Sequence, residues 1–425
     1  MSATPVSSAP DAAPRAALSD SAFPVLAGVT FIDGLGASIV LPLLPFIMLA
    51  FGAQPALVAQ LVGFYSLASV IGNPVLGRLS DRIGRPPVVI VTLFGTMLAY
   101  IGIVFSWSLA GVFAFRVMSG FISGRSAIVR ALATDGTDPE TQVRRIGTLS
   151  AWTAIGVSVG PSLATLVALM EPTREGQYRS TLLVAVGLCL IATLAFIACT
   201  GRPRLMPAAV SPAGGASTKL MPLVRTIRFP LIMTAMAAYA DGVMLSVSAL
   251  FAQERFGWGV VETGWLISAM TAGVAGARLF LMHRLVGSLG AATAIGLALG
   301  CAGAGLLAMA YAQSAPAFVL ASALYASGVG LANMLPAVII TRTSPAEHRG
   351  LALGLNQALM ALSIFVATSA NGLLFQYVRP EAPHLVAATV ALLGAAIAVG
   401  HRRRAHSATT AGGRHRAAGQ TRSPN

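Results

Sequence analysis

The sequence predicts an all-α integral membrane protein in which twelve transmembrane helices form two pseudo-symmetric six-helix bundles. Three observations support this fold class. Hydrophobic residues make up 56% of the 425 residues and charged residues only 10%, and the mean hydropathy is +0.77. Most charges lie between apolar runs that are long enough to cross a bilayer, which takes roughly 20 residues per span. Features of the first six runs recur in the last six, as in membrane proteins built from internal repeats.

The apolar runs give the expected elements in order. The first six spans are residues 22–47, 57–77, 87–107, 109–133, 147–170 and 180–200, and the last six are 230–252, 260–282, 289–311, 315–340, 350–374 and 383–400. We therefore expect an N-terminal bundle at 22–200, a Pro/Gly/Arg-rich cytoplasmic linker at 201–229 and a C-terminal bundle at 230–400. Residues 1–21 are expected to be a disordered cytoplasmic tail, and residues 401–425 a disordered basic one.

The net charge of +14 lies mainly on one side of the predicted bundle. With both termini in the cytoplasm, most Lys and Arg residues are cytoplasmic, and those outside are Arg174, Arg179, Arg255 and Arg379. This is the positive-inside pattern, so we expect a multi-pass protein of the cell (inner) membrane with cytoplasmic termini. The lipid bilayer is then a partner of the basic tail. No soluble domain presents the charge, so no nucleic-acid partner is expected.

The sequence carries no pattern for chemistry on a substrate. Cys189, Cys199 and Cys301 lie inside apolar runs, and we expect them to be small buried residues without disulfide or metal roles. The chain has no His/Glu zinc pattern, no P-loop and no convincing nucleophile–base pair. We therefore expect no enzyme activity, no cofactor, no metal and no ATP-driven transport.

The two halves share sequence features. Asp33-Gly34 and Asp241-Gly242 lie equally far into spans 1 and 7, and Thr137-Asp-Pro139 recurs as Thr343-Ser-Pro345. Two six-span halves related by such a repeat place a binding site at their interface near the middle of the membrane.

The clear ionisable residues inside spans are Asp33, Arg116, Arg125 and Asp241. Each costs several kcal/mol in hydrocarbon, so each is a candidate for function. At 1.5 Å per residue, Asp33 and Arg116 lie at depths where they can meet. They form either a proton-handling pair or a permanent ion pair that joins spans 1 and 4. Arg125 lies nine residues after Arg116, on the opposite helix face at about 100° per residue, so both cannot face one cavity. Asp241 either binds a substrate cation or a second proton, or it bonds to a neighbouring helix.

Three motifs resemble the major facilitator superfamily, and in particular its drug:proton antiporters of the tetracycline-efflux kind. The resemblance covers roughly residues 22–400. The turn Gly77-Arg-Leu-Ser-Asp81-Arg82-Ile-Gly84-Arg85 is similar to the G-x-L-x-D-R-x-G-R loop between spans 2 and 3. Arg116-Val-Met-Ser-Gly120 resembles the R-x-x-x-G motif of span 4. Gly156-Val-Ser-Val-Gly160-Pro161 resembles the span-5 antiporter signature, but it lacks the terminal glycine pair.

The resemblance implies roles for these residues. A gate would latch the cytoplasmic faces of the two halves while the protein opens outward, and its residues would be Gly77, Asp81, Arg82, Gly84, Arg85 and Asp135. The alternative is that the arginines only anchor the topology. In the second half Gly287 stands where the first has Asp81, so the latch would be asymmetric. Gly156 and Gly160 would pack helices closely, and Pro161 would permit a bend. The span-5 motif serves either ordinary packing or the blocking of proton leak.

The expected function is secondary active transport, namely proton-coupled efflux of small amphipathic compounds of the multidrug or antibiotic type, by alternating access. The protein would work as a monomer. Asp33 would carry the proton, Arg116 would tune it, and Asp241 and Arg125 would contact the small-molecule substrate. The alternative is a superfamily importer or facilitator of an anionic metabolite. Arg125 and Arg130 stand where tetracycline exporters have small residues, which favours a substrate with an anionic group. A third class is a non-transporting receptor or scaffold.

Overall fold

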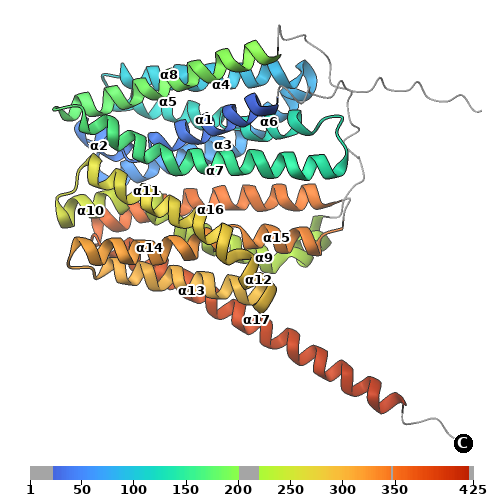
Figure 1. The fold of residues 1–425 in the computed structure, drawn as a ribbon. Coiled ribbons are helices and arrows are strands. Elements are labelled where there is room, and N and C mark those ends of the chain that lie inside the picture. Colours follow the sequence, from blue (N-terminus) through green and yellow to red (C-terminus); the bar gives the residue numbers. More distant parts are fainter. Residues whose placement is uncertain (1–22, 201–219, 346–347, 421–425) are drawn as a thin grey trace, which may run out of the picture.

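The computed structural model describes residues 23–200, 220–345 and 348–420. Its helices lie side by side in two groups, the first half from blue to green and the second from yellow to red in Figure 1. The expected tail 1–21 lies outside the described residues, as do residues 201–219 of the expected linker.

The first half contains eight helices among the described residues. They are α1 (Phe23–Ile39), α2 (Leu44–Ala50), α3 (Pro55–Ile83), α4 (Arg85–Val104), α5 (Leu109–Phe121), α6 (Arg125–Thr134), α7 (Pro139–Leu169) and α8 (Arg174–Thr200).

The second half repeats this plan. Its helices are α9 (Leu220–Ser246), α10 (Ser248–Phe256), α11 (Val260–Gly276), the π-helical η1 (Ala277–Leu281), α12 (Met282–Leu289), α13 (Ala291–Ala310), α14 (Ala315–Ala332), α15 (Leu335–Thr343), α16 (Arg349–Tyr377) and α17 (Ala382–Gln420).

The predicted fold class is confirmed. Within the described ranges, eleven helices are long and apolar enough to span a membrane, and α1 with α2, bent by 40°, makes a twelfth. Large apolar side chains also point away from the protein, for example Val91, Phe94 and Leu98, which are 54%, 54% and 46% exposed on α4. Such stripes are expected where lipid covers the helix rather than water.

Several boundaries differ from the expectation. The helix α3 continues through the expected turn to Ile83, and α9 begins at Leu220, inside the expected linker. The expected disordered tail is instead helical as far as Gln420, since it forms the end of α17, which extends beyond the bundle (Figure 1).

Of the cysteines, Cys189 is buried, but Cys199 is partly exposed and Cys301 is exposed. A membrane helix can present a small thiol to lipid, so location in a span did not imply burial.

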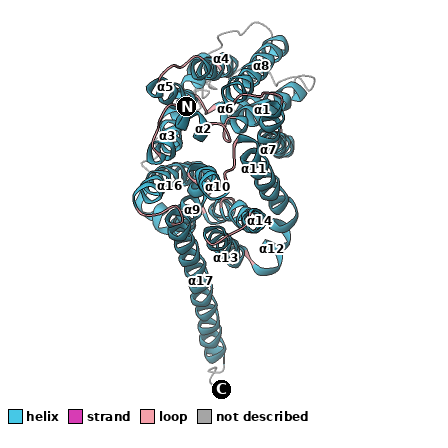
Figure 2. Cartoon of the chain, turned by 90° about the vertical axis from the view of Figure 1, so that its left-hand side faces the viewer, coloured by secondary structure: helices cyan, strands magenta, loops and turns pink. Residues whose placement is uncertain are grey.

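The two halves meet at one end of the molecule, which we call the outer end. It carries the turns at 51–54, 170–173 and 257–259, and the opposite, inner end carries Gly84 and Gly290. Figure 2 looks onto the outer end and shows α3 beside α16 and α7 beside α11. The names follow the predicted orientation.

Small residues bring the facing helices together at the outer end. A Cβ added to Gly372 of α16 would lie 2.7 Å from the Cβ of Ala59 on α3. The side chain of Gln376 accepts a hydrogen bond from the backbone N–H of Ala56 at 3.1 Å and donates one to Gln54 at 2.8 Å. Across the other contact, the Ser158 hydroxyl lies 3.5 Å from the carbonyl of Thr271. The halves are therefore packed together at the outer end.

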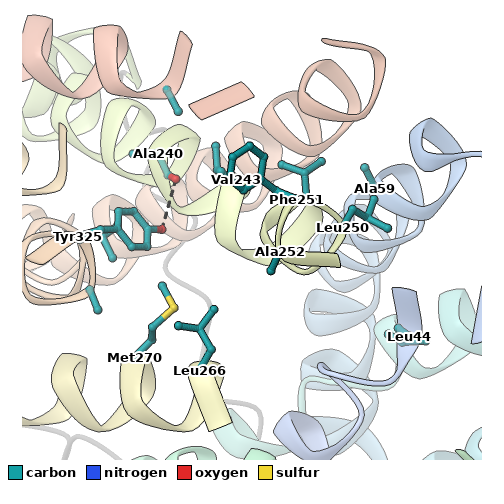
Figure 3. Packing of buried hydrophobic residues seen from close by; sticks show 14 of the residues in the cluster. Leu44, Ala59, Ala240, Val243, Leu250, Phe251, Ala252, Leu266, Met270 and Tyr325 are labelled. Atoms are coloured by element: carbon teal, nitrogen blue, oxygen red, sulfur yellow. Dashed lines mark hydrogen bonds between the residues drawn. The ribbon is translucent and has the colours of Figure 1, made fainter. Parts of the chain in front are cut away.

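The largest hydrophobic cluster includes residues of both halves. Leu44 and Ala59 come from the first half, and Leu250, Phe251 and Tyr325 come from the second. Figure 3 shows this part of the cluster, with α10 next to the helices of the first half. Apolar packing therefore continues across the seam between the halves.

Candidate functional site: charged residues within the spans

Span 4 is broken, and the break decides which arginine meets Asp33. The helix α5 ends at Phe121 and α6 begins at Arg125. The residues between them do not continue the helix, so the angular relation between Arg116 and Arg125 is not that of one regular helix. As a result, Arg125 rather than Arg116 forms an ion pair with Asp33. The expected contact between Asp33 and Arg116 is not found in this structure.

The Arg125–Asp33 pair is well enclosed. The side chain of Arg125 is 4% exposed and that of Asp33 is 18% exposed. A second nitrogen of Arg125 donates a hydrogen bond to the hydroxyl of Thr96 at 3.3 Å. Its Nε has no hydrogen-bond partner among the described residues. On the adjoining helix, the hydroxyl of Tyr100 donates to the carbonyl of Gly36 at 2.8 Å, which ties α4 to α1.

A small cavity adjoins this ion pair. Its volume is about 10 Å³, and its wall includes Asp33, Arg125, Thr96, Tyr100 and Cys189. A cavity of roughly this volume is at the lower limit for one water molecule, provided that polar partners are present. The carboxylate, the guanidinium and the hydroxyls supply such partners.

Arg116 lies in a different environment. Its guanidinium carbon is 4.3 Å from the centre of the Tyr65 ring on α3, which is a cation–π contact. A Cβ on Gly120, one helical turn later, would lie 2.5 Å from the Tyr65 carbonyl. The glycine of the R-x-x-x-G motif therefore allows α5 to approach α3, and this approach places Arg116 on the tyrosine. The side chain is 4% exposed, and its Nε has no partner among the described residues.

In the second half, neutral groups hold Asp241. The amide of Asn333 donates to one carboxylate oxygen at 2.9 Å, and the hydroxyl of Tyr325 lies 3.4 Å from the other. That hydroxyl also lies 3.3 Å from the carbonyl of Ala240 (Figure 3). No ion pair to Asp241 is formed by the described residues. The guanidinium of Arg278 instead donates to the carbonyl of Gly330 at 3.0 Å.

The predicted gate residues lie at the inner end. Arg85 and Asp135 form an ion pair of 2.6 Å between α4 and the end of α6. The turn consists of Gly84 alone, whose φ of +95° favours glycine. Asp81 and Arg82 are exposed on the last turn of α3, and Asp81 has no ion pair with any described residue. A Cβ on Gly77 would meet nothing within 4 Å, so no close contact between helices requires a glycine at this position.

The span-5 motif faces α1. A Cβ on Gly156 would lie 2.9 Å from the backbone nitrogen of Leu35, and one on Gly160 would lie 2.7 Å from the carbonyl of the same residue. Pro161 is buried inside α7, and its carbonyl lies 3.4 Å from a Cβ added to Gly264 of α11. The motif therefore lies between span 1 and the other half of the protein.

Some residues of these sites escaped sequence reasoning. Tyr65 and Thr96 are ordinary residues of spans 2 and 3, and nothing in the sequence marks them as partners of arginines. Asn333 carried a usable signal, because an amide inside the apolar run 315–340 needs a hydrogen-bond partner. Tyr325 in the same run carried a weaker one.

Comparison with known families fits this geometry. The family model described as Major Facilitator Superfamily matches residues 26–281 and 230–422. The chain belongs to the major facilitator superfamily. Membership in this superfamily of membrane transporters supports the prediction of a multi-pass transport protein rather than an enzyme.

Relatives within the superfamily include tetracycline resistance proteins. The class B protein of Escherichia coli is 25% identical over 245 residues, which is 57% of this chain and 61% of the relative. The chain thus spans about three fifths of that protein's length. The class C protein of Escherichia coli is 26% identical over 363 residues, covering 81% of this chain and 87% of the relative. A solved mutant of the nucleoside transporter NupG superimposes with a TM-score of 0.75 at 13% identity, covering 89% and 99% of the two chains.

Proposed function

We propose that this protein exports small amphipathic compounds in exchange for protons, as a monomer in the cell (inner) membrane with both termini in the cytoplasm. The observation that carries the proposal is the enclosed ion pair between Asp33 and Arg125 at the break of span 4. The naming of relatives as tetracycline resistance proteins supports the class of compound.

Asp33 carries the proton. Arg125, instead of the predicted Arg116, is the ion-pair partner of this carboxylate. Protonation removes the charge of Asp33 and leaves an enclosed guanidinium without a counter-ion. Breaking a buried pair in this way costs about 3–5 kcal/mol. A conformation that gives Arg125 another partner or more solvent is then favoured, so proton binding shifts the equilibrium between two states. The adjoining cavity has room for about one water molecule through which the proton arrives.

The latch residues and Arg116 have roles in the proposed alternation between two conformations. The packed outer end supports a conformation closed to the outside. In the opposite conformation, exposed Asp81 and Arg82 would meet the second half and join Arg85 and Asp135 in the latch. Arg116, stacked on Tyr65, stays a candidate proton-coupling residue and belongs in the tests below.

Everted membrane vesicles test the proposal. Vesicles loaded with acid are given tetracycline, ethidium or benzoate, and a pH-sensitive dye follows protons leaving the vesicle. We expect proton release with at least one amphipathic compound and none in Asp33→Asn. Asp138→Asn is the matched control, because Asp138 is an exposed N-cap and Asn caps equally well. Normal exchange by Asp33→Asn would contradict the proposal.

The alternative, import or facilitated passage of an anionic metabolite, also has an observation in its favour. Arg116 and Arg125 are enclosed, and the Nε of each has no hydrogen-bond partner among the described residues. If protonation of Asp33 frees Arg125 to bind a substrate anion, proton and substrate bind together and move in the same direction. The sign of the proton flux therefore separates the two functions, and co-movement with benzoate would favour the alternative.

A further inference from the structure

A larger cavity, which we call the outer cavity, lies at the outer end of the first half. Its volume is about 500 Å³, within the range of about 300–1,000 Å³ that is usual for ligand sites. It lies between α2, the end of α4 and the start of α8, and it shares no wall residue with the small cavity beside Asp33. The proposed exchange cycle does not use it, so it is a candidate site for a separate ligand.

The deeper wall of the outer cavity is apolar. It is formed by buried side chains of α2, α4 and α8, namely Phe46, Ile47, Ile103, Val104 and Leu182. Leu182 lies eight residues after Arg174 along α8, which is about 12 Å toward the middle of the membrane at 1.5 Å per residue. A hydrocarbon chain can therefore occupy the cavity while a polar headgroup stays at the outer end.

The rim of the outer cavity is polar and carries a net positive charge. The charged residues that line it are Arg174, Glu175 and Arg179. Glu175 and Arg179 form an exposed ion pair of 2.9 Å, whereas Arg174 forms no ion pair with any residue in the described ranges. A guanidinium binds a phosphate group through two parallel hydrogen bonds. Arg174 is thus available for the headgroup of an anionic ligand.

The bilayer lies next to this cavity. Phe105 and Leu183 directly follow wall residues on α4 and α8, and both are exposed. Large apolar side chains exposed on membrane spans contact lipid. Trp107, which follows the wall residue Ser106, is 92% exposed, and tryptophan is typical of the membrane–water interface. Lipid is therefore present both at the depth of the rim and beside the apolar wall.

We propose that the outer cavity binds an anionic phospholipid of the surrounding bilayer, with its phosphate at Arg174 and one acyl chain between α2, α4 and α8. Gln253 of α10 also lines the cavity, so the lipid contacts both halves where the outer end is packed. A ligand that prefers one conformation shifts the equilibrium toward it, and this lipid holds the outer end closed. The binding site is independent of the proposed function, and only the effect on conformation rests on that function.

Native mass spectrometry of the purified full-length protein tests the binding. The probes are dioleoylphosphatidylglycerol and dioleoylphosphatidylcholine, which have the same chains and differ in the net charge of the headgroup. We expect the wild type to bind its tightest phosphatidylglycerol at least threefold more strongly than phosphatidylcholine, and Arg174→Gln should remove this preference. Arg379→Gln should match the wild type, because Arg379 lies in an exposed outer turn of the second half and does not line the cavity.

A second variant tests the place of the acyl chain. Ala50 lines the cavity and is exposed, so Ala50→Trp fills space there without a change of charge. It should weaken the binding of both lipids at least threefold, whereas Leu320→Trp, at an exposed position on α14, should have no effect. Inorganic phosphate, compared with chloride at equal ionic strength, should not displace phosphatidylglycerol, because it offers nothing to the apolar wall. Gel filtration shows whether each variant is folded.

Three results would each overturn the lipid site. They are equal binding of the two lipids by the wild type, unchanged phosphatidylglycerol binding by a folded Arg174→Gln or Ala50→Trp, and displacement of the lipid by phosphate. The first and third need no variant, so the test does not depend on the folding of either one.

Spin labels on the two halves test the effect on conformation. Met170 and Tyr311 are exposed at the outer ends of α7 and α13, and electron paramagnetic resonance measures the distances between labels at these positions. In nanodiscs, phosphatidylglycerol should lower the population of the longer distances at least twofold relative to phosphatidylcholine, and Ala50→Trp should abolish this difference. Equal distance distributions in the two lipids would overturn the effect on conformation. Intact lipid binding without proton exchange would refute the proposed function and leave the lipid site standing.

Discussion

A double-mutant cycle on Asp33 distinguishes the two arginines of span 4. The changes are Asp33→Asn, Arg125→Gln, Arg116→Gln, and the two pairs that contain Asp33→Asn. The side chain of Arg125 is 4% exposed and its carboxylate partner 18% exposed. Removing either charge leaves the other enclosed, so Asp33→Asn and Arg125→Gln should each lower the free energy of unfolding by about 3–5 kcal/mol.

The double change Asp33→Asn with Arg125→Gln removes both charges and should cost less than the sum. We expect a coupling of about 2 kcal/mol for this pair, within the range of about 0.5–3 kcal/mol found for residues in contact. Asp33 with Arg116 should couple by less than about 0.5 kcal/mol, because Arg116 contacts Tyr65 instead.

The free energies come from unfolding in mixed micelles of dodecyl maltoside and dodecyl sulfate, followed by the fluorescence of the four tryptophans. Circular dichroism on the same samples checks that each variant begins from the same helical content. Strong coupling of Asp33 to Arg116, with none to Arg125, would refute the assignment of the ion pair.

Three further predictions concern packing, the gate and alternating access. Gly160→Ala should destabilise the protein by about 1–3 kcal/mol, since a Cβ there meets the backbone of α1. Gly77→Ala, with open space at its Cβ, should be neutral or stabilising by about 0.5–1 kcal/mol, and equal losses at both sites would contradict this packing. Arg85→Gln removes the inner-end ion pair, and because that pair is partly exposed we expect a loss of only about 1 kcal/mol in stability but a several-fold fall in transport in vesicles. Cysteines at Gln54 and Gln376, in a background without native cysteines, should be joined by a bifunctional methanethiosulfonate reagent, because the ends of these long side chains meet in a hydrogen bond of 2.8 Å; transport should stop on cross-linking and return on reduction, and unimpaired transport by the cross-linked protein would argue against movement at the outer end.

Composition and charge placement were enough to predict the spans and their arrangement in two halves. Hydropathy and charge bias are averaged over runs of about 20 residues, so an error of a few residues at the end of a span does not change the number or the order of the spans. The ends themselves were harder. The turn at 77–87 carries several polar residues, yet only Gly84 leaves the helix. Polar side chains at the end of a spanning helix reach water without unwinding it, so polarity alone did not locate the turn.

The ion pair could not be predicted in detail, because a regular helix through span 4 would direct Arg116 and Arg125 to opposite faces. The break between Phe121 and Arg125 changes the direction in which every later side chain points. The glycines Gly120 and Gly124 were a visible signal of this break. The same limit applied to Asp241, whose partner Asn333 also lies at a break. Intramembrane charges were thus found from sequence, but their partners required the path of the backbone.

The seam at the outer end has a consequence for the speed of the conformational change. Ala56, Ala59 and Gly372 meet there with little between their backbones. Glycine and alanine have no side-chain rotamers to order, so closing such a seam loses almost no side-chain entropy. Separating these three residues frees no interlocked side chains, and the local cost is the loss of the hydrogen bonds of Gln376 with Ala56 and Gln54. We expect the activation barrier between the two states to come from the ion pairs, the moving helices and the larger side chains that meet across the seam, such as Phe64 and Phe365, with only a small share from the contact of Ala56, Ala59 and Gly372.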